Sequence, residues 1–328
     1  MRSKYQRDIY RKMKYRFIIF ISLALVLGNC KPATKQTTSV ISDTEKSNLE
    51  GLSKNEGIRS DPDGAFDYNS PDFTFVLDSN LREISGLSYD LSDNTLIAVD
   101  DESGKYFHLS PIDGKVTNKI RFHRDGDYEA IAYNDSKVII AKSSGNLYVK
   151  EKDVEKTKVY KNKFKSRNDV EGLAFLPESN TLLVACKGNT LDENDKENIK
   201  CIYKFSLTDS LLEEQPYLSI DRNVLKQFIT AGFSKHSIIS KAKMTNRIKD
   251  FAPSGIAVHP DSQDLYILSA RGSTLIIYDK ELKLTDIIFL NAKTIPQPEG
   301  ICFDNENNLY ISTEGQVLSA KIFKYLAK

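Results

Sequence analysis

Acidic side chains recur at matched positions of a short phrase that the chain repeats five times. The residue that leads each copy precedes a Gly or Ala and then an apolar residue; the leading residues are Ser85, Glu129, Glu171, Ser254 and Glu299. Two residues before these stand Glu83, Asp127, Asp169, Ala252 and Gln297. Side chains two apart on a strand point to the same side. If the copies surround one axis, we expect six carboxylates to face it, from Glu83, Asp127, Glu129, Asp169, Glu171 and Glu299.

Carboxylates brought this close repel one another and need a compensating charge. One candidate is Ca²⁺, which binds oxygens from carboxylates, carbonyl groups and water. Another is a ring of basic side chains after the next apolar run, formed by Lys142, Lys187 and Arg271, with Asp101, Glu102 and Glu314 at related positions. A third makes two of the carboxylates an acid/base pair for hydrolysis. We favour the cation and keep the other two interpretations open.

Other side chains at the same level would line the same central channel. We expect this lining to include Ser85, Glu83, Ser254, Lys142, Lys187, Arg271 and Glu314. The sequence contains no Gly-x-Ser-x-Gly, P-loop, Gly-x-Gly-x-x-Gly or His-Glu-x-x-His motif. Cys186 and Cys201 could pair in an oxidising compartment, but buried thiols are the favoured interpretation.

The elements that must position these groups are short strands. Each phrase is followed by a polar turn and a four-residue apolar run rich in β-branched residues, which predicts strands buried on both faces. Further short strands follow in each copy, and four strands per copy arranged around an axis make a β-propeller blade. The copies begin 44, 42, 83 and 45 residues apart. The sequence therefore predicts an all-β, five-bladed β-propeller.

The spacing of 83 residues leaves room for a sixth blade. We interpret residues 209–250 as an insertion with one or two turns of helix at 224–229, and a degenerate sixth repeat is the alternative. The last copy ends with the chain and lacks a fourth strand of its own. Residues 73–77, just before the first copy, can supply that strand, and closing the ring in this way removes free sheet edges.

The first 29 residues have the pattern of a targeting segment. Seven basic residues precede an eleven-residue apolar run, 17–27, which is too short to span a membrane and is followed by Gly-Asn-Cys30. This pattern predicts a lipoprotein-type signal peptide at 1–29 and lipidation of Cys30. Residues 30–70 are polar and predict a disordered tether, while residues 71–328 form the propeller domain. Without residues 1–29 the net charge is −5, from 39 basic and 44 acidic residues, which does not favour nucleic-acid binding.

The repeated phrases resemble one bacterial family. Glu171-Gly-Leu-Ala-Phe175, Glu299-Gly-Ile-Cys-Phe303 and Asp127-Tyr-Glu-Ala-Ile-Ala132 are similar to the SdiA-regulated (YjiK-like) family of envelope proteins, over residues 73–326. The resemblance implies a five-bladed propeller, distantly similar to NHL-repeat propellers, with a calcium site and no established enzymatic activity. Carried over to this chain, it implies Glu129, Glu171 and Glu299 as ligands, with Asp127 and Asp169 as further candidates.

We therefore expect a calcium-binding, lipid-anchored protein of the bacterial cell envelope, on its periplasmic or surface side, that acts as a binding or sensing module. Its expected partners are the membrane, through the lipid, and an envelope protein or a small-molecule ligand. We expect a monomer that binds no nucleic acid. The alternative is a metal-dependent hydrolase of phosphoesters or lactones that uses the same central carboxylates.

Overall fold

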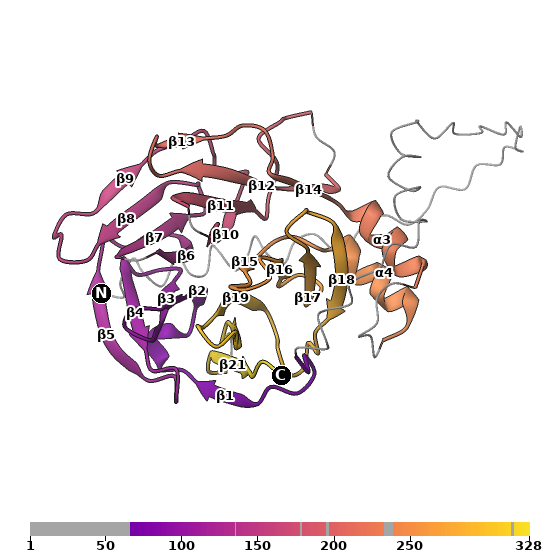
Figure 1. The fold of residues 1–328 in the computed structure, drawn as a ribbon, viewed down its shortest axis with the longest axis horizontal. Helices are drawn as coiled ribbons and strands as arrows, with labels where there is room; N and C mark the ends of the chain where they lie inside the picture. Colours follow the sequence, from indigo (N-terminus) through magenta and orange to yellow (C-terminus); the bar gives the residue numbers. More distant parts are fainter. Residues whose placement is uncertain (1–65, 135, 178, 195–196, 233–238, 316–317) are drawn as a thin grey trace, which may run out of the picture. The chain divides into compact units, whose positions relative to one another are not determined.

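The computed structural model describes residues 66–134, 136–177, 179–194, 197–232, 239–315 and 318–328. The predicted signal peptide, Cys30 and the tether up to residue 65 lie outside these ranges. The described residues form five antiparallel sheets around one axis, with β2, β6, β10, β15 and β19 innermost (Figure 1). This arrangement is a five-bladed β-propeller, so the predicted fold is confirmed.

Each blade is an antiparallel sheet of strands that follow one another in the chain, with one exception in blade 5. Blade 1 contains β2 (Ile84–Asp90), β3 (Thr95–Asp100), β4 (Lys105–Leu109) and β5 (Val116–Arg121). Blade 2 contains β6 (Tyr128–Asn134), β7 (Lys137–Lys142), β8 (Leu147–Glu151) and β9 (Lys158–Tyr160). Blade 3 contains β10 (Val170–Phe175), β11 (Thr181–Cys186), β12 (Ile199–Ser206), β13 (Leu211–Leu212) and β14 (Leu218–Asp221). Blade 4 contains β15 (Gly255–Val258), β16 (Leu265–Ser269), β17 (Thr274–Tyr278) and β18 (Leu284–Phe289).

Blade 5 closes the ring with strands from both ends of the described chain. It contains β19 (Pro298–Phe303), β20 (Leu309–Thr313) and β21 (Lys321–Tyr325), and β1 (Phe73–Val76) completes it. β1 pairs with β21 in antiparallel register, from Phe73 opposite Lys324 to Val76 opposite Lys321. The short helix η1 (Ser79–Leu81) then leads into β2 of blade 1. The predicted closing strand is therefore confirmed.

The long spacing between the third and fourth phrases holds an insertion. The described residues between β14 and β15 contain α3 (Arg222–Thr230) and α4 (Lys241–Lys249), and they contain no sixth blade (Figure 1). Asp221 begins α3 by accepting a hydrogen bond from the N–H of Asn223. Leu225, Phe228 and Ile229 recur at helical spacing, and they pack in one core with strand residues of blades 3 and 4.

The inner strands of four blades begin with a β-bulge. The register between first and second strands shifts at Ile84/Gly86, Tyr128/Ala130, Val170/Gly172 and Pro298/Gly300. The residue skipped in each shift leads its phrase: Ser85, Glu129, Glu171 or Glu299. A bulge inserts one residue and re-aims its side chain. The simple two-residue alternation that we assumed at this position is therefore wrong.

The Gly of the phrase allows neighbouring inner strands to approach closely. A Cβ on Gly86 would lie 2.7 Å from the backbone nitrogen of Ile131 on β6. A Cβ on Gly300 would lie 2.6 Å from Cβ of Leu87 on β2. Neither position has room for a side chain, so these glycines keep the inner ring tight and bring the leading residues of adjacent blades together.

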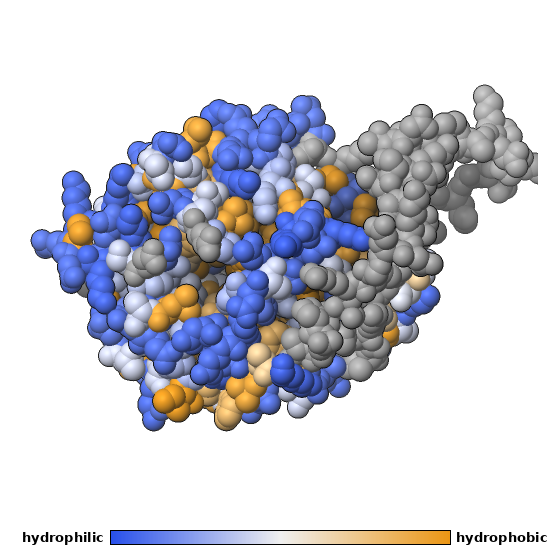
Figure 2. Space-filling view, viewed as in Figure 1, coloured by the Kyte–Doolittle hydropathy of each residue, from blue (hydrophilic) through white to orange (hydrophobic). Residues whose placement is uncertain are grey.

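The surface of the propeller is mostly hydrophilic on the face shown in Figure 2, with hydrophobic residues scattered among the polar ones. Phe66 and Tyr68, which we expected in the tether, are only 3% and 2% exposed and pack in the core of blades 4 and 5. The folded part therefore includes these residues as well. Across the ranges given above, neither α-helix has the length and apolar character needed to cross a membrane.

Candidate metal centre

Four blades contain the same backbone hydrogen bond near the propeller axis. Each of these bonds joins two residues of one blade. In each of these blades, the first residue after the second strand donates its N–H to a carbonyl oxygen. The acceptor is the residue that lies two positions before the leading residue of the phrase. The pairs are Asp101 to Glu83 at 3.1 Å, Ser143 to Asp127 at 3.2 Å, Lys187 to Asp169 at 2.8 Å, and Glu314 to Gln297 at 3.3 Å. We call the region formed by these residues and the leading residues of the five phrases the hub.

Of the three bases expected in a ring, only Lys187 occupies this matched position. Lys142 stands one residue earlier, opposite Tyr128 in the strand register, and its ammonium lies 5.3 Å from the centre of the Tyr128 ring. Arg271 stands one residue later than Ala270, the first residue after β16, and is exposed. The hub therefore contains one ammonium group at this level rather than a ring of three bases.

Lys187 and Glu171 form a buried ion pair. The Lys187 Nζ lies 2.6 Å from Oε1 of Glu171, and the two side chains are 19% and 6% exposed. Burial raises the pKa of Glu171 to about 8, although Lys187 acts in the opposite direction. Burial alone would lower the pKa of Lys187, but the carboxylates of Glu171 and Glu299 raise it above its usual value. This pair is the structural salt bridge that we kept open as an alternative.

Glu129 and Glu299 carry carboxyl groups without a hydrogen bond or ion pair to any residue in the described ranges. Both side chains are half-buried. Burial, then the charges of Glu171 and Asp127, raise the pKa of Glu129 to about 9. Burial also raises the pKa of Glu299 to about 8, and the charge of Glu129 contributes. Glutamates of blades 2, 3 and 5 thus lie close enough to influence one another's ionisation.

Three of the remaining predicted residues, Asp127, Ser85 and Ser254, form local side-chain hydrogen bonds. Asp127 is exposed and accepts a short hydrogen bond from the hydroxyl of Ser143. Asp169 is half-buried with a φ of 52°, and burial raises its pKa while Lys187 lowers it. Ser85 donates to the carbonyl oxygen of Glu83 at 3.4 Å. Ser254 donates to the carbonyl oxygen of Pro298 at 2.8 Å, which joins blade 4 to blade 5.

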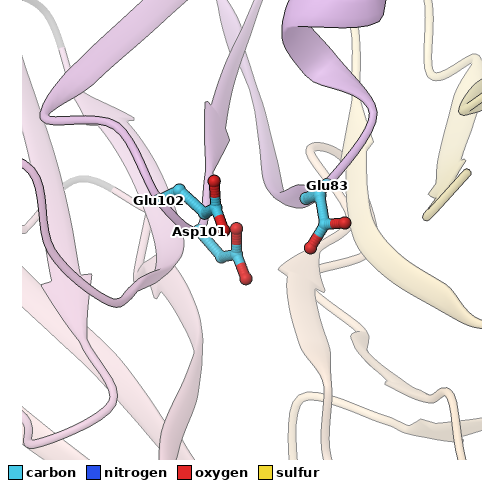
Figure 3. A group of neighbouring side chains, drawn as sticks. All are labelled: Glu83, Asp101 and Glu102. Atoms are coloured by element: carbon cyan, nitrogen blue, oxygen red, sulfur yellow. The ribbon is translucent and has the colours of Figure 1, made fainter. Parts of the chain in front are cut away.

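The most compact acidic group in the hub is Glu83, Asp101 and Glu102 of blade 1. One carboxylate oxygen from each lies within 4.8 Å of the others. Figure 3 shows Asp101 and Glu102 adjacent on the turn after β3, and Glu83 on the segment that leads into β2. Burial, then the charges of Glu83 and Glu102, raise the pKa of Asp101 to about 7. The four largest charges that act on Asp101 are all carboxylates, whereas the largest charge that acts on Glu171 is the ammonium of Lys187.

Two side-chain oxygens of the hub, in neighbouring blades, are buried without a hydrogen-bond partner among the described residues. They are Oδ1 of Asp101 in blade 1 and Oε1 of Gln297 in blade 5. A buried oxygen that accepts no hydrogen bond is costly unless water or a cation meets it. The blade 1 side of the hub could therefore hold a cation, whereas the blade 3 side already contains the ammonium of Lys187.

From the sequence we expected Glu83 to line the central channel and placed Asp101 and Glu102 at positions related to the predicted ring of bases. We did not expect these three residues to form one group. The register of β2 and β3, with Ile84 opposite Asp100, is what places Glu83 beside Asp101. The sequence did contain a signal for this group. Two adjacent acidic residues follow the second strand of blade 1, and another acidic residue precedes its first strand. Cys186 and Cys201 are buried free thiols, as the favoured interpretation predicted.

The fold and the hub define a class: a five-bladed β-propeller with carboxylates from several blades gathered at its axis. The chain matches the SdiA-regulated family over residues 70–190 and 213–318, so it belongs to that family. The predicted family is therefore confirmed. No curated protein sequence matches the chain.

Several solved structures resemble the propeller at low sequence identity. Glutaminyl cyclase from Myxococcus xanthus aligns with a TM-score of 0.50 and 11% identity, covering 78% of this chain and 94% of that one. Luciferin-regenerating enzyme aligns with a TM-score of 0.49 and 11% identity, covering 79% and 96%. A gluconolactonase from Xanthomonas campestris aligns with a TM-score of 0.43 and 12% identity, covering 74% and 72%. At these identities the likeness extends to the fold alone.

Proposed function

We propose that this propeller binds Ca²⁺ at its hub and acts as a calcium-dependent binding or sensing module of the cell envelope. The observation that carries the proposal is the group of Glu83, Asp101 and Glu102, whose oxygens lie within 4.8 Å of one another. The buried and unpartnered Oδ1 of Asp101 belongs to this group. These residues would hold the ion, and the ion would offset the negative charges of the three carboxylates.

The chemistry of the donors fits calcium. Ca²⁺ prefers oxygen ligands at about 2.3–2.6 Å, so two ligands on opposite sides of one ion lie up to ~5 Å apart. The separations within the group meet this limit. Mg²⁺ needs oxygens at about 2.0–2.1 Å in near-ideal octahedral geometry, which fits this spread less well. Gln297 adds a neutral side-chain oxygen in the neighbouring blade.

The predicted ligands differ in how readily they could contribute. Glu129 and Glu299 have no ion-pair partner among the described residues and remain candidates on the axis. Asp127, which is exposed, and Asp169, which is half-buried, remain further candidates. Glu171 already contacts Lys187, so it could bind the ion only if the ammonium moved away. We therefore place the ion nearer Asp101 than Glu171.

Calcium would act by ordering the blades. The three proposed ligands belong to blade 1, but the charge of Asp101 repels Glu314 in blade 5 and Glu129 in blade 2, and this repulsion opposes the closed ring. A divalent cation would cancel part of that repulsion and hold the inner strands in register. A partner that recognises the ordered form of this surface would then bind only in the presence of calcium.

The test is a calcium titration of the full chain, purified in detergent and treated with chelator. Millimolar Ca²⁺ should raise the melting temperature, and Asp101→Asn should remove most of the rise. A matched control is Asp125→Asn, which changes an exposed aspartate outside the hub. If calcium leaves the melting temperature of the chelator-treated protein unchanged, the proposal is refuted.

A second variant locates the ion within the hub. If the ion sits at Glu83, Asp101 and Glu102, Glu171→Gln should reduce calcium affinity less than Asp101→Asn. The opposite order would place the ion on the predicted ligands Glu129, Glu171 and Glu299 instead. At pH 9, where both carboxyl groups are ionised, each variant removes one carboxylate charge from the hub, so a difference between them reports position rather than net charge.

Membrane anchoring through Cys30 is part of the same proposal and rests on the sequence pattern of residues 1–30. Labelled fatty acid supplied to cells should be incorporated into the wild-type protein and not into Cys30→Ser. The substituted protein should also move from the membrane to the soluble fraction. Incorporation of label into both proteins would count against this assignment.

Metal-dependent hydrolysis is the alternative, and one observation favours it. The pKa of Glu129 is raised to about 9 by burial, so this carboxyl group would carry a proton at neutral pH and could act as a general acid. Turnover of phosphoesters or lactones that requires calcium and is lost in Glu129→Gln would establish this activity. Calcium binding without turnover would leave the module without catalysis.

A further inference from the structure

Three cations gather where the insertion joins blades 3 and 4. Lys200 is the second residue of β12, Arg222 is the first residue of α3, and Arg271 lies in the turn between β16 and β17. Lys200 is only 7% exposed, Arg222 is half-buried and Arg271 is exposed. A buried lysine is unusual unless it is paired with an acidic group.

The pairing of β12 with β14 places Lys200 near Arg222. Lys200 lies opposite Ile220, two residues before Arg222. The backbone N–H of Arg222 donates to the carbonyl oxygen of Asn198 at 3.1 Å, which fixes the start of α3 beside the start of β12. The Lys200 ammonium donates one hydrogen bond, to the carbonyl oxygen of Gly188 at 2.7 Å.

A chain of hydrogen bonds connects Arg222 to the turn that carries Arg271. Nε of Arg222 donates to the carbonyl oxygen of Phe251 at 2.8 Å. The next residue, Ala252, donates its N–H to the hydroxyl of Ser269 at 3.0 Å. That hydroxyl donates to the carbonyl oxygen of Arg271 at 2.6 Å. These contacts fix the backbone that carries Arg222 and Arg271, and among the described residues they use one side-chain donor of Lys200 and one of Arg222.

None of the three cations forms an ion pair with a carboxylate in the described ranges. The charges of Glu197 and Asp250 attract Arg222, and the charge of Asp169 attracts Lys200 and Arg271, in each case without an ion pair. Lys187 in the same blade shows the contrast, because its ammonium lies 2.6 Å from a carboxylate oxygen. Burying a cation without a direct partner is unfavourable. Among the described residues, the cluster thus has carboxylates nearby but none in direct contact with its charged groups.

We propose that Lys200, Arg222 and Arg271 form a binding site for an oxyanion, the phosphate or carboxylate group of a small ligand. An ammonium has three donors and a guanidinium has five, and guanidinium groups match the oxygens of phosphate or carboxylate in pairs. One donor of Lys200 and one of Arg222 are used in the contacts above. The site uses residues outside the proposed calcium ligands, so it does not depend on calcium binding.

The ionisation of Lys200 agrees with this assignment. Burial, then the charges of Arg222 and Arg271, lower the pKa of Lys200 to about 8. A bound oxyanion would counter both effects and return the pKa toward its usual value. Filling the site would therefore favour the charged form of the lysine.

The test measures the melting temperature of the full chain in detergent at pH 7, with inorganic phosphate, succinate or sodium chloride at equal ionic strength. At roughly ten times the dissociation constant, the binding anion should raise the melting temperature by about 3–5 °C. A rise with phosphate alone indicates a phosphoryl ligand, and a rise with succinate alone indicates a carboxylate. Arg222→Gln/Arg271→Gln should lose the rise, whereas Lys226→Gln/Lys249→Gln, which removes two positive charges from α3 and α4 outside the cluster, should keep it.

Lys200→Met supplies a readout that needs no ligand. It replaces a buried, unpaired charge with an apolar side chain of similar length, so in chloride it should melt no lower than the wild type. It should also lose the response to phosphate or succinate. Equal shifts with chloride and with both oxyanions, or a full shift in Arg222→Gln/Arg271→Gln, would overturn the proposal.

Discussion

Replacing Glu129 by Gln should stabilise the protein at alkaline pH when calcium is absent. The pKa of Glu129 is raised from an ordinary value of 4.5 to about 9, first by burial and then by the charges of Glu171 and Asp127. Between these two values the folded state retains a proton that the unfolded state has lost. Stability is therefore fully present below pH 4.5 and is lost as the pH rises toward 9.

The magnitude follows from the width of this interval. One group contributes at most ~1.4 kcal/mol per pH unit, so at pH 7.5 the upper bound is roughly 4 kcal/mol. We expect about half of this, ~2 kcal/mol, because water reaches part of the half-buried side chain. Gln mimics the protonated carboxyl group, so Glu129→Gln should remove the loss at pH 7.5 and have little effect at pH 4.5.

The assay is urea denaturation of the chelator-treated protein at several pH values from 5 to 9. The free energy of unfolding of the wild type should fall more steeply with pH than that of Glu129→Gln. Glu155→Gln, on the exposed turn between β8 and β9, is the matched control and should follow the wild type. Parallel profiles for the wild type and Glu129→Gln, or a variant less stable than the wild type at pH 8.5, would refute the reasoning.

Three further predictions concern the hub. Calcium affinity should increase as the pH rises from 6 to 8, because Asp101, whose pKa is about 7, loses its proton in this range. Titration calorimetry at a series of pH values would measure the affinity, and an affinity that does not change with pH would contradict the prediction. Lys187→Met should destabilise the protein by up to ~3–5 kcal/mol at pH 9, and less at pH 6 where Glu171 takes up a proton, as denaturation at both pH values would show; equal losses would argue against the ion pair. Gly300→Ala should cost about 1–3 kcal/mol, because its Cβ would lie 2.6 Å from Cβ of Leu87, and an unchanged melting temperature would show that the inner strands can separate.

The fold was predictable because it depends on a pattern that recurs along the chain. Five phrases, each followed by a short apolar run, specified five inner strands, and residues 73–77 were the available partner for the last blade. The helices of the insertion were underestimated. Leu225, Phe228 and Ile229 have helical spacing, but α4 buries only Met244 and Ile248 and carries a weaker pattern.

The site was predictable only in outline. Counting two residues per strand repeat placed the acidic residues near one axis, but it could not foresee the bulges that re-aim Glu129, Glu171 and Glu299. A difference of one residue in sequence position also decides which bases reach the hub. Lys187 is the first residue after its strand and contacts Glu171, whereas Lys142 is the last residue of its strand and its ammonium lies over the Tyr128 ring. The contact of Lys187 with Glu171 depends on side-chain placement between strands, which a single sequence does not specify.

The joint between β1 and β21 has a mechanical consequence. Four residue pairs, from Phe73 with Lys324 to Val76 with Lys321, join the first and last strands of the circle. A pull on the chain from the N-terminal side would reach Phe66 and Tyr68 and then this joint before any other blade. Tension strong enough to strip β1 away would open the circle between blades 5 and 1 and relax the crowding of charge at its centre.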